Sequence, residues 1–304
     1  MAPTISIVAS MHNRKQQTLD IVDKLFLPSI LKNATKDMQF ILIDDQSPMS
    51  VQTKAIVDKH APMLKKRLGQ FLFVKNKTNL GFAKSYNRGM SLSKAPLLLV
   101  TNDDVYFPQG SIEKLARAAN DDKHAGVVGP VTNCASAYQN TQLFKKLESY
   151  AKPEIDRIEK FSQWLSQVMH GKTYSVKKLI GFCVVYKRDI LDKTGLYDTK
   201  YIYGNAEDDD LHHRIVKQGY DLKLIGDIFV EHGGISGGHA SIKQRPLHMA
   251  RHYVLNCLKF GISNNKILES IWIAYIRNPV QERGFFTITK EIEKNRKLLG
   301  IEKF

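Results

Sequence analysis

The stretch Phe40-Ile41-Leu42-Ile43-Asp44-Asp45-Gln46-Ser47 decides the fold, because a short apolar run ends abruptly in carboxylates and other polar side chains. The run Phe40–Ile43 has the length and composition of a buried β-strand. Strands buried on both faces are typical of parallel sheets covered by helices, and such sheets bind ligands beyond the carboxyl ends of their strands. We therefore expect Asp44 and Asp45 to lie at the edge of the sheet where the chemistry occurs.

Similar apolar runs recur along the chain and alternate with helical patterns. Strands are predicted at Ile5–Ala9, Phe71–Val74, Leu97–Val100, Val127–Val128, Leu179–Tyr186 and Leu222–Val230. Helices are predicted at about 14–33, 50–61, 82–93 and 110–120, and at Ala206–Gln218, where Gly219 closes the helix. This alternation predicts an α/β fold with a Rossmann-like, mostly parallel sheet flanked by helices.

Two segments do not follow this alternation of strands and helices. Residues 133–178 contain one amphipathic helix, Pro153–His170, and we expect them to be an insertion that is either an acceptor-side element or simply packed on the core. From His239 to the end, 12 Lys and Arg stand against 5 acidic residues in a largely helical pattern. We therefore predict a catalytic domain over 1–240, insertion included, and a basic helical C-terminal extension over 241–304.

The composition limits the classes of protein that the chain can belong to. It has 304 residues and a formal charge of +15, which suits nucleic acid, nucleotide phosphates or an acidic membrane face, or is only a basic surface. Cys134, Cys183 and Cys257 form no Cys-x-x-Cys pair, which excludes a zinc ribbon. Without a signal peptide or an 18-residue apolar run, we expect a cytoplasmic protein, with peripheral contact to a membrane as the alternative.

Polar clusters follow two more of the predicted strands. They are Ser10-Met11-His12-Asn13-Arg14 and Thr101-Asn102-Asp103-Asp104. Each could be a helix cap, but convergence of several at one sheet edge favours a site. Alternation along an extended chain places Asn102 and Asp104 on the same side, with Asp103 pointing elsewhere. Asp104 can therefore be a direct ligand of Mg²⁺ or Mn²⁺.

A run of acids and a histidine supply further chemistry. Four acids from Glu207 to Asp210 open a predicted helix, where one or two would satisfy the helix dipole. Asp208 shares a partly apolar face with Leu211 and Ile215, so packing can hold it as a general base. His232 follows an apolar strand and precedes a glycine-rich loop; it is either a metal ligand or an ordinary surface or core histidine.

Taken in order, these motifs resemble glycosyltransferase family two enzymes, which have the GT-A fold, over about residues 4–260. Ala9-Ser10-Met11-His12-Asn13 stands where the family usually has Pro-Thr-Tyr-Asn, and Asp44-Asp45-Gln46-Ser47 is similar to its nucleoside-binding motif. Asn79-Leu80-Gly81-Phe82-Ala83 and Asn87-x-Gly89 are similar to segments of rhamnosyl- and galactofuranosyltransferase-like members. Asn102-Asp103-Asp104 stands where the metal motif belongs, and Glu207-Asp208-x-Asp210-Leu211 with Arg214 matches the catalytic helix.

The resemblance implies inverting transfer of a hexosyl or deoxyhexosyl group from a nucleoside diphosphate sugar, UDP- or dTDP-linked, to a hydroxyl of a glycan, a lipid-linked sugar or a protein. Asp208, with Glu207, would be catalytic, and Asp104 and His232 would hold the cofactor, Mn²⁺ or Mg²⁺. The residues implied in donor binding are Ser10, Asn13, Arg14, Asp44, Asp45, Asn79, Gly81, Lys84, Asn102 and Asp103.

Two alternatives from other classes stay open at this point. The positive charge suits a nucleic-acid-binding protein, although acidic clusters at the strand ends would repel a polyanion. A nucleotidyltransferase on a similar fold would need a glycine-rich loop after the first strand, and Ser10–Gln17 contains no glycine. For the C-terminal extension, packing on the catalytic domain or on a second copy in a homo-oligomer is favoured over membrane-surface contact.

Overall fold

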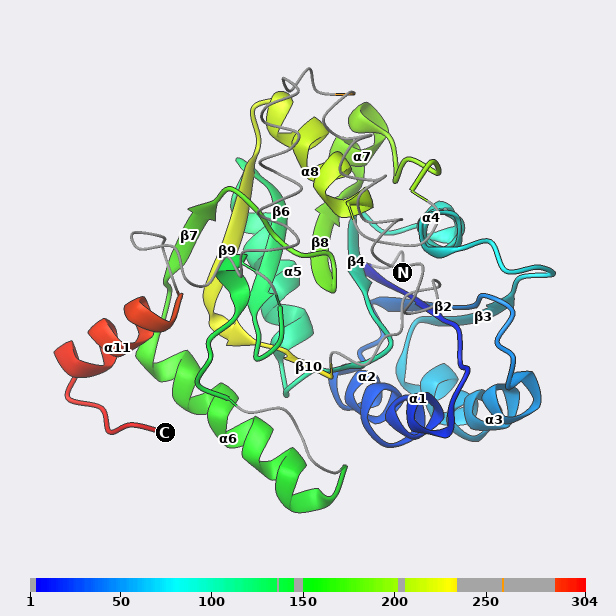
Figure 1. Cartoon of the computed structure of the whole chain (residues 1–304), viewed down its shortest axis with the longest axis horizontal. Helices are drawn as coiled ribbons and strands as arrows, with labels where there is room; N and C mark the ends of the chain where they lie inside the picture. Colours follow the sequence, from blue (N-terminus) through cyan, green and yellow to red (C-terminus); the bar gives the residue numbers. More distant parts are fainter. Residues whose placement is uncertain (1–3, 136, 145–149, 202–205, 234–258, 260–287) are drawn as a thin grey trace, which may run out of the picture.

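A single large sheet organises the chain, for which the computed structural model describes residues 4–135, 137–144, 150–201, 206–233, 259 and 288–304. The strand order is β3-β2-β1-β4-β8-β6-β9-β7 (Figure 1). The strands are β1 (Ile5–Met11), β2 (Met38–Asp44), β3 (Gln70–Lys75), β4 (Leu97–Thr101), β6 (Ala125–Val131), β7 (Thr173–Val176), β8 (Cys183–Lys187) and β9 (Asp221–Phe229). Only β8 and β7 pair antiparallel with their neighbours, so the predicted α/β fold with a mostly parallel sheet is confirmed.

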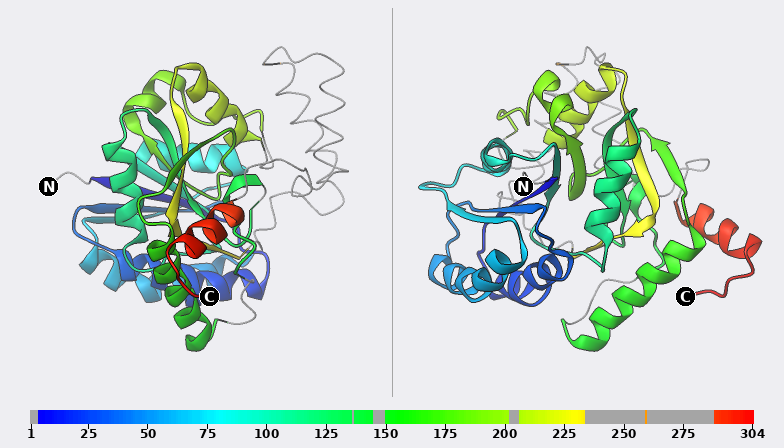
Figure 2. Two further views of the ribbon diagram at one scale, coloured as in Figure 1. Left: turned by 90° about the vertical axis from the view of Figure 1, so that its left-hand side faces the viewer. Right: turned by 180° about the vertical axis from the view of Figure 1, so that it is seen from behind.

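Helices cover both faces of this sheet, as Figures 1 and 2 show. They are α1 (Gln16–Ile21), η1, a π-helical segment (Val22–Phe26), α2 (Leu27–Asn33), α3 (Ser50–Arg67), α4 (Phe82–Leu92), α5 (Ser111–Asp121), η2, a short 3₁₀ helix (Ala137–Gln139), α6 (Lys152–Val168), α7 (Arg188–Thr194), α8 (Glu207–Lys217) and α11 (Ile288–Leu298). The helix predicted at 14–33 is thus one helical stretch in which a π-helical turn separates two α-helical parts.

The alternation of side chains along the strands creates two apolar layers. In β2, Phe40 and Leu42 face the layer that holds α2, α3 and α5, whereas Ile41 and Ile43 face the layer that holds α4, α6 and α8. All four side chains are fully buried. Burial on both faces explains why the sequence of β2 is a continuous apolar run.

Helix α4 approaches β1 unusually closely, and this explains the Asn87-x-Gly89 pattern. A Cβ at Gly89 would lie 2.4 Å from Cγ1 of Val8, so only glycine permits this packing. Asn87 donates its side-chain amide to the carbonyl of Tyr197 at 2.8 Å and accepts the amide N–H of Tyr197 at 3.0 Å. Both motif residues therefore position α4 and the chain after α7.

The prediction of a strand over Leu179–Tyr186 is wrong in its first half, because β8 begins at Cys183. The backbone N–H of Gly181 is donated to Asp208 instead of to a neighbouring strand. Five elements were not predicted: α7, the short helix η2, the edge strand β7, and the two-residue strands β5 (Val105–Tyr106) and β10 (Glu231–His232), which pair antiparallel.

The described end of the C-terminal extension packs against the rest of the protein. Ile288 and Ile292 of α11 are fully buried, and Figure 2 shows α11 beside α6. The indole Nε1 of Trp164 donates a hydrogen bond to the carbonyl of Glu302 at 2.9 Å. The ring centroids of Phe304 and Phe161 lie 5.0 Å apart. The rest of the helical extension predicted over 241–304 lies outside the described residues, apart from Lys259.

Within the described ranges, no helix has both the length and the apolar character needed to cross a bilayer.

Candidate active site

The strand order reverses between β1 and β4, so a crevice opens there at the carboxyl ends of the strands. β1 pairs in parallel with β2 on one side and with β4 on the other. The three polar clusters singled out in the sequence therefore gather around this point. Its architecture is that of a ligand-binding site in an open α/β sheet.

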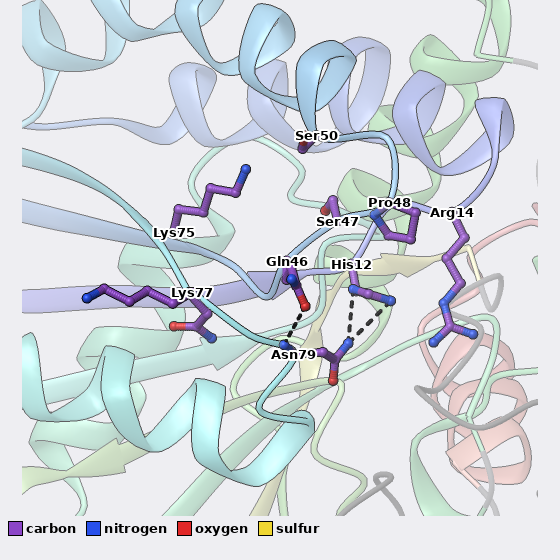
Figure 3. Close-up of a pocket in the computed structure, with 10 residues that line it drawn as sticks. His12, Arg14, Gln46, Ser47, Pro48, Ser50, Lys75, Lys77 and Asn79 are labelled. Atoms are coloured by element: carbon purple, nitrogen blue, oxygen red, sulfur yellow. Dashed lines mark hydrogen bonds between the residues drawn. The ribbon is translucent and has the colours of Figure 1, made fainter.

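A pocket of about 870 Å³ lies at the carboxyl ends of β1, β2 and β3 (Figure 3). It is lined by His12, Arg14, Gln46, Ser47, Pro48, Ser50, Lys75, Asn76, Lys77 and Asn79. This lining has three Lys and Arg side chains, several amides and hydroxyls, and no carboxylate. Such a lining suits an uncharged polar group with an anion attached to it, as in a nucleotide.

The two predicted aspartates lie behind the pocket and hold its loops. Asp45 is fully buried; its Oδ1 accepts hydrogen bonds from Asn76 Nδ2 and Leu80 N, both at 2.8 Å, and its Oδ2 accepts one from Gly81 N at 3.0 Å. Asp44 Oδ1 accepts the backbone N–H of Ser47 at 2.8 Å. Both carboxylates thus shape the pocket from behind, through the chain's own backbone.

The residues after β1 differ in their exposure. Asn13 is fully buried and its Nδ2 donates to Thr53 Oγ1 at 3.1 Å, which ties this loop to α3. Ser10 has a buried hydroxyl without a hydrogen-bond partner in the described part of the chain. Arg14 is exposed and lines the pocket, whereas Lys84 is exposed on α4 and does not line it.

Asp104 and His232 meet although they are far apart in the sequence. The pairing of β10 with β5 places His232 opposite Val105, next to Asp104. Nε2 of His232 lies 3.4 Å from Oδ1 of Asp104 and 3.3 Å from Nδ2 of Asn102. Both residues are buried, and the ring centroid of His232 lies 4.7 Å from that of Phe182 in a stacked arrangement.

This pair fits a divalent cation. Nδ1 of His232 lies 2.6 Å from the carbonyl of Cys134, so it carries the proton and Nε2 can act as a ligand. Two ligands of an octahedral ion stand about 3 Å apart, close to the separation found here. No cluster of three or more His, Cys, Asp or Glu is found in the described ranges.

The charge of Asp104 shifts the pKa values of its neighbours. Burial raises the pKa of Asp103 to about 8, and the neighbouring charge of Asp104 adds to the shift. Burial alone would lower the pKa of His232, but the hydrogen bond and charge of Asp104 raise it above its ordinary value. A proton on Nε2 of His232 would therefore compete with a metal ion for the same nitrogen atom.

Asp208 is held with little freedom at the start of α8. Its Oδ2 accepts the N–H of Gly181 at 2.7 Å and its Oδ1 accepts the N–H of Asp209 at 2.9 Å. Leu211 and Ile215 on the same face are fully buried, as the sequence predicted. Burial, followed by the charge of Asp209, raises the pKa of Asp208 to about 6. A carboxylate with this pKa can accept a proton near neutral pH.

The other acids of α8 have different surroundings. Asp210 is fully buried and pairs with Arg214, whose Nη2 lies 2.8 Å from its Oδ2; Lys259 lies 2.6 Å from its other oxygen. Asp209 pairs with Lys178 at 2.7 Å. Glu207 is buried next to Ala206, which has a left-handed backbone with φ +73°. Asp210 thus stabilises the helix, while Asp208 faces Gly181.

The sequence did not indicate the pocket roles of His12 and Gln46, nor the contact of Gly181 with Asp208. His12 and Gln46 stand in the polar clusters after β1 and β2, and this was the only signal that could have found them. The contact of Gly181 joins segments that are distant in the sequence, so no local pattern reports it.

The model of the family described as "Glycosyl transferase family 2" matches residues 6–195, well over half of the chain. The chain belongs to this family of glycosyltransferases. A search of curated protein sequences finds no match.

Solved structures share the fold at low sequence identity. A mannosyltransferase, PcManGT, from Pyrobaculum calidifontis in complex with GDP-Man and Mn²⁺ has a TM-score of 0.58 and 15% identity over 99% of this chain and 76% of that chain. S. aureus TarS 1-349 in complex with UDP-GlcNAc has a TM-score of 0.59 and 16% identity over 92% and 76%. GalNAc-T7 with UDP, GalNAc and Mn²⁺ has a TM-score of 0.61 and 16% identity, and the match spans 100% of this chain and 55% of that one.

Proposed function

We propose that this glycosyltransferase is a metal-dependent, inverting enzyme that moves a hexosyl or deoxyhexosyl group from a nucleoside diphosphate sugar to an acceptor hydroxyl. The observation that carries the proposal is the meeting of Asp104 and His232 at the edge of the sheet that also holds the pocket. Family membership argues against the nucleic-acid-binding and nucleotidyltransferase alternatives.

The donor would lie along the carboxyl ends of the strands. Its nucleoside would fill the pocket beside His12 and Gln46, and its diphosphate would extend toward Asp104. UDP- or dTDP-linked sugars are the expected donors. The solved relatives hold GDP-Man, UDP-GlcNAc and UDP, which supports a nucleotide sugar without choosing among them.

Asp104 and His232 would hold Mn²⁺ or Mg²⁺ together with the donor phosphates. The ion would supply positive charge that stabilises the departing diphosphate. Two of the solved relatives are complexes with Mn²⁺, which is consistent with this role. Asn102, whose amide nitrogen lies 3.3 Å from Nε2 of His232, would contact the donor beside the two metal ligands.

Asp208 would act as the general base. The acceptor oxygen attacks the anomeric carbon, the acceptor proton passes to the carboxylate of Asp208, and the bond from the anomeric carbon to the phosphate oxygen breaks. The nucleoside diphosphate leaves with the electron pair of that bond. Because attack comes from the face opposite the leaving group, the product has inverted configuration. Glu207, the neighbour of the base, would belong to the same catalytic site.

The finer assignments belong to the same proposal. The segment Asn79–Ala83 supports a rhamnosyl- or galactofuranosyltransferase-like subtype. The acceptor would be a glycan, a lipid-linked sugar or a protein, and the protein would be cytoplasmic. Residues 1–240 would form the catalytic domain, with 133–178 as an insertion and 241–304 as an extension that could join two copies.

A screen of nucleoside diphosphate sugars tests the proposal. Thermal stabilisation and slow hydrolysis would be measured for each donor with Mn²⁺, with Mg²⁺ and with EDTA. We expect one donor to raise the melting temperature and to be hydrolysed only when the metal is present. Equal activity in EDTA would refute the metal assignment, and a lack of response to every donor would refute the proposed activity.

A further inference from the structure

Gln46 has a backbone conformation that side chains normally avoid. Its φ is +55°, in the left-handed region, and its side chain is exposed. Glycine adopts this conformation without strain, whereas a residue with a Cβ atom pays a steric cost. An exposed glutamine in such a place gains nothing from core burial. Strain of this kind at the rim of a pocket points to a use for the side chain.

The side chain of Gln46 lines the pocket and also joins two of its loops. Its Oε1 accepts the backbone N–H of Asn79 at 2.8 Å, which joins the loop after β2 to the loop after β3. Figure 3 shows the side chain among the lining residues, beside His12. Oε1 keeps a second lone pair, and Nε2 is the part of the amide that can donate hydrogen bonds to a ligand.

The neighbouring His12 supplies a flat surface. Its Nδ1 lies 2.8 Å from the carbonyl of Asp45, which holds the ring in place. Burial lowers the pKa of His12, so the ring is neutral at pH 7. A neutral imidazole beside an amide donor suits a planar heterocycle that carries a carbonyl oxygen.

We infer that Gln46 donates a hydrogen bond from Nε2 to a carbonyl oxygen of the donor's nucleobase and thereby selects oxo bases over amino bases. The oxygen meant is O4 of uracil and thymine or O6 of guanine, because cytosine and adenine carry an amino group at these positions. An amino group there would face a second donor, and neither N–H would be satisfied. The inference rests on the proposed function, because it names the base of the nucleotide that the pocket would bind.

Gln46→Glu separates this role from the structural one. The substitution keeps an oxygen for the N–H of Asn79 and removes only the donor that faces the ligand. Isothermal titration of the full-length protein with UDP, GDP, CDP and ADP, in the presence of Mn²⁺, gives the four affinities. We expect the wild type to bind UDP or GDP at least about tenfold more tightly than CDP and ADP, and the variant to lose about tenfold for the oxo base.

The ratio of affinities distinguishes recognition from plain charge repulsion. UDP and CDP carry the same diphosphate, so repulsion by the new carboxylate weakens both equally. Loss of a specific hydrogen bond instead lowers the ratio of UDP to CDP affinity by about tenfold. If the variant keeps the wild-type ratio, or if the wild type prefers CDP or ADP, the inference is wrong while the proposed function stands.

Gln142 is a matched control within the chain. It is also an exposed glutamine with φ +55°, and it does not line the pocket. Gln46→Gly and Gln142→Gly should both leave the melting temperature unchanged or raise it, because each relieves the same backbone strain. Only Gln46→Gly should lose UDP affinity and base discrimination. If the wild type binds none of the four nucleotides, the proposed function fails, and the inference fails with it.

Discussion

Because Gly181 contacts Asp208, a substitution at Gly181 can shift the proposed base while Asp208 itself stays unchanged. A Cβ at Gly181 would lie 2.9 Å from Cβ of Asp208 and 3.1 Å from its Oδ2. Ordinary carbon contacts begin at about 3.5 Å, so Gly181→Ala must move the two groups apart by roughly half an ångström. A displacement of about 1 Å can cost about 10²-fold in rate. We therefore expect turnover to fall about tenfold or more.

The pH dependence of turnover provides the second measure of this substitution. Only the ionised form of Asp208 accepts a proton, so wild-type turnover should fall as pH drops through about 6. The hydrogen bond from the N–H of Gly181 lowers the pKa of Asp208. Displacement weakens that bond, so the acid limb of the kcat profile should move to higher pH. Steady-state kinetics from pH 5 to about 8 would detect this shift.

Gly226→Ala is the control for overpacking alone. A Cβ at Gly226 would lie 3.0 Å from the carbonyl oxygen of Lys172 and 3.0 Å from Cε of Met169, so the crowding is similar but does not involve Asp208. Both substitutions should destabilise the fold by about 1–3 kcal/mol. Only Gly181→Ala should shift the pH profile. Wild-type kcat and pH profile in Gly181→Ala would refute the view that Gly181 positions the base.

Three further predictions address the base, the metal and the C-terminal extension. Asp208→Asn should lower kcat by about 10²-fold or more with donor affinity retained in titrations, because it removes the proton acceptor and little else; equal losses of affinity and kcat would mean a structural role. Asp104→Ala should abolish stimulation by Mn²⁺ or Mg²⁺ and weaken donor binding, and full activity of this variant or of the wild type in EDTA would contradict the metal site. Deleting residues 262–304 should lower the melting temperature, because Ile288 and Ile292 are fully buried and burial of each side chain contributes about 1.5–3 kcal/mol. Co-sedimentation with anionic vesicles at physiological salt that is lost on this deletion, with the melting temperature unchanged, would favour membrane contact instead.

Much of the sheet could be predicted, because burial of a strand on both faces leaves a continuous apolar run. The runs that became β1 to β4 were located to within one or two residues. The short strands β5 and β10 could not be predicted, since two residues carry no period and their pairing partner is far along the chain. The start of β8 was misplaced because the backbone at Gly181 bonds to a side chain, and nothing local shows this.

The candidate site could also be predicted only in part. The motif residues at the strand ends were visible because parallel strands bring their carboxyl ends to one edge. Which way Asp45 and Gln46 face was not visible. Asp45 was expected to touch the donor, yet its oxygens accept hydrogen bonds from Asn76, Leu80 and Gly81. Gln46, one residue later, is the side chain that lines the pocket.

The amino-acid sequence by itself determined the alternation of strands and helices, the family and the positions of the chemical groups, because these depend on local pattern and spacing. The family resemblance already implied that Asp104 and His232 share a metal ion, and only the tertiary structure decided how their side chains meet and that Gly181 holds Asp208. These contacts join residues that are distant along the chain, and their geometry is set by the pairing of β10 with β5 and by the close packing of α8 against the loop before β8. Such contacts depend on how whole elements pack, and the local sequence around each partner carries no record of the other.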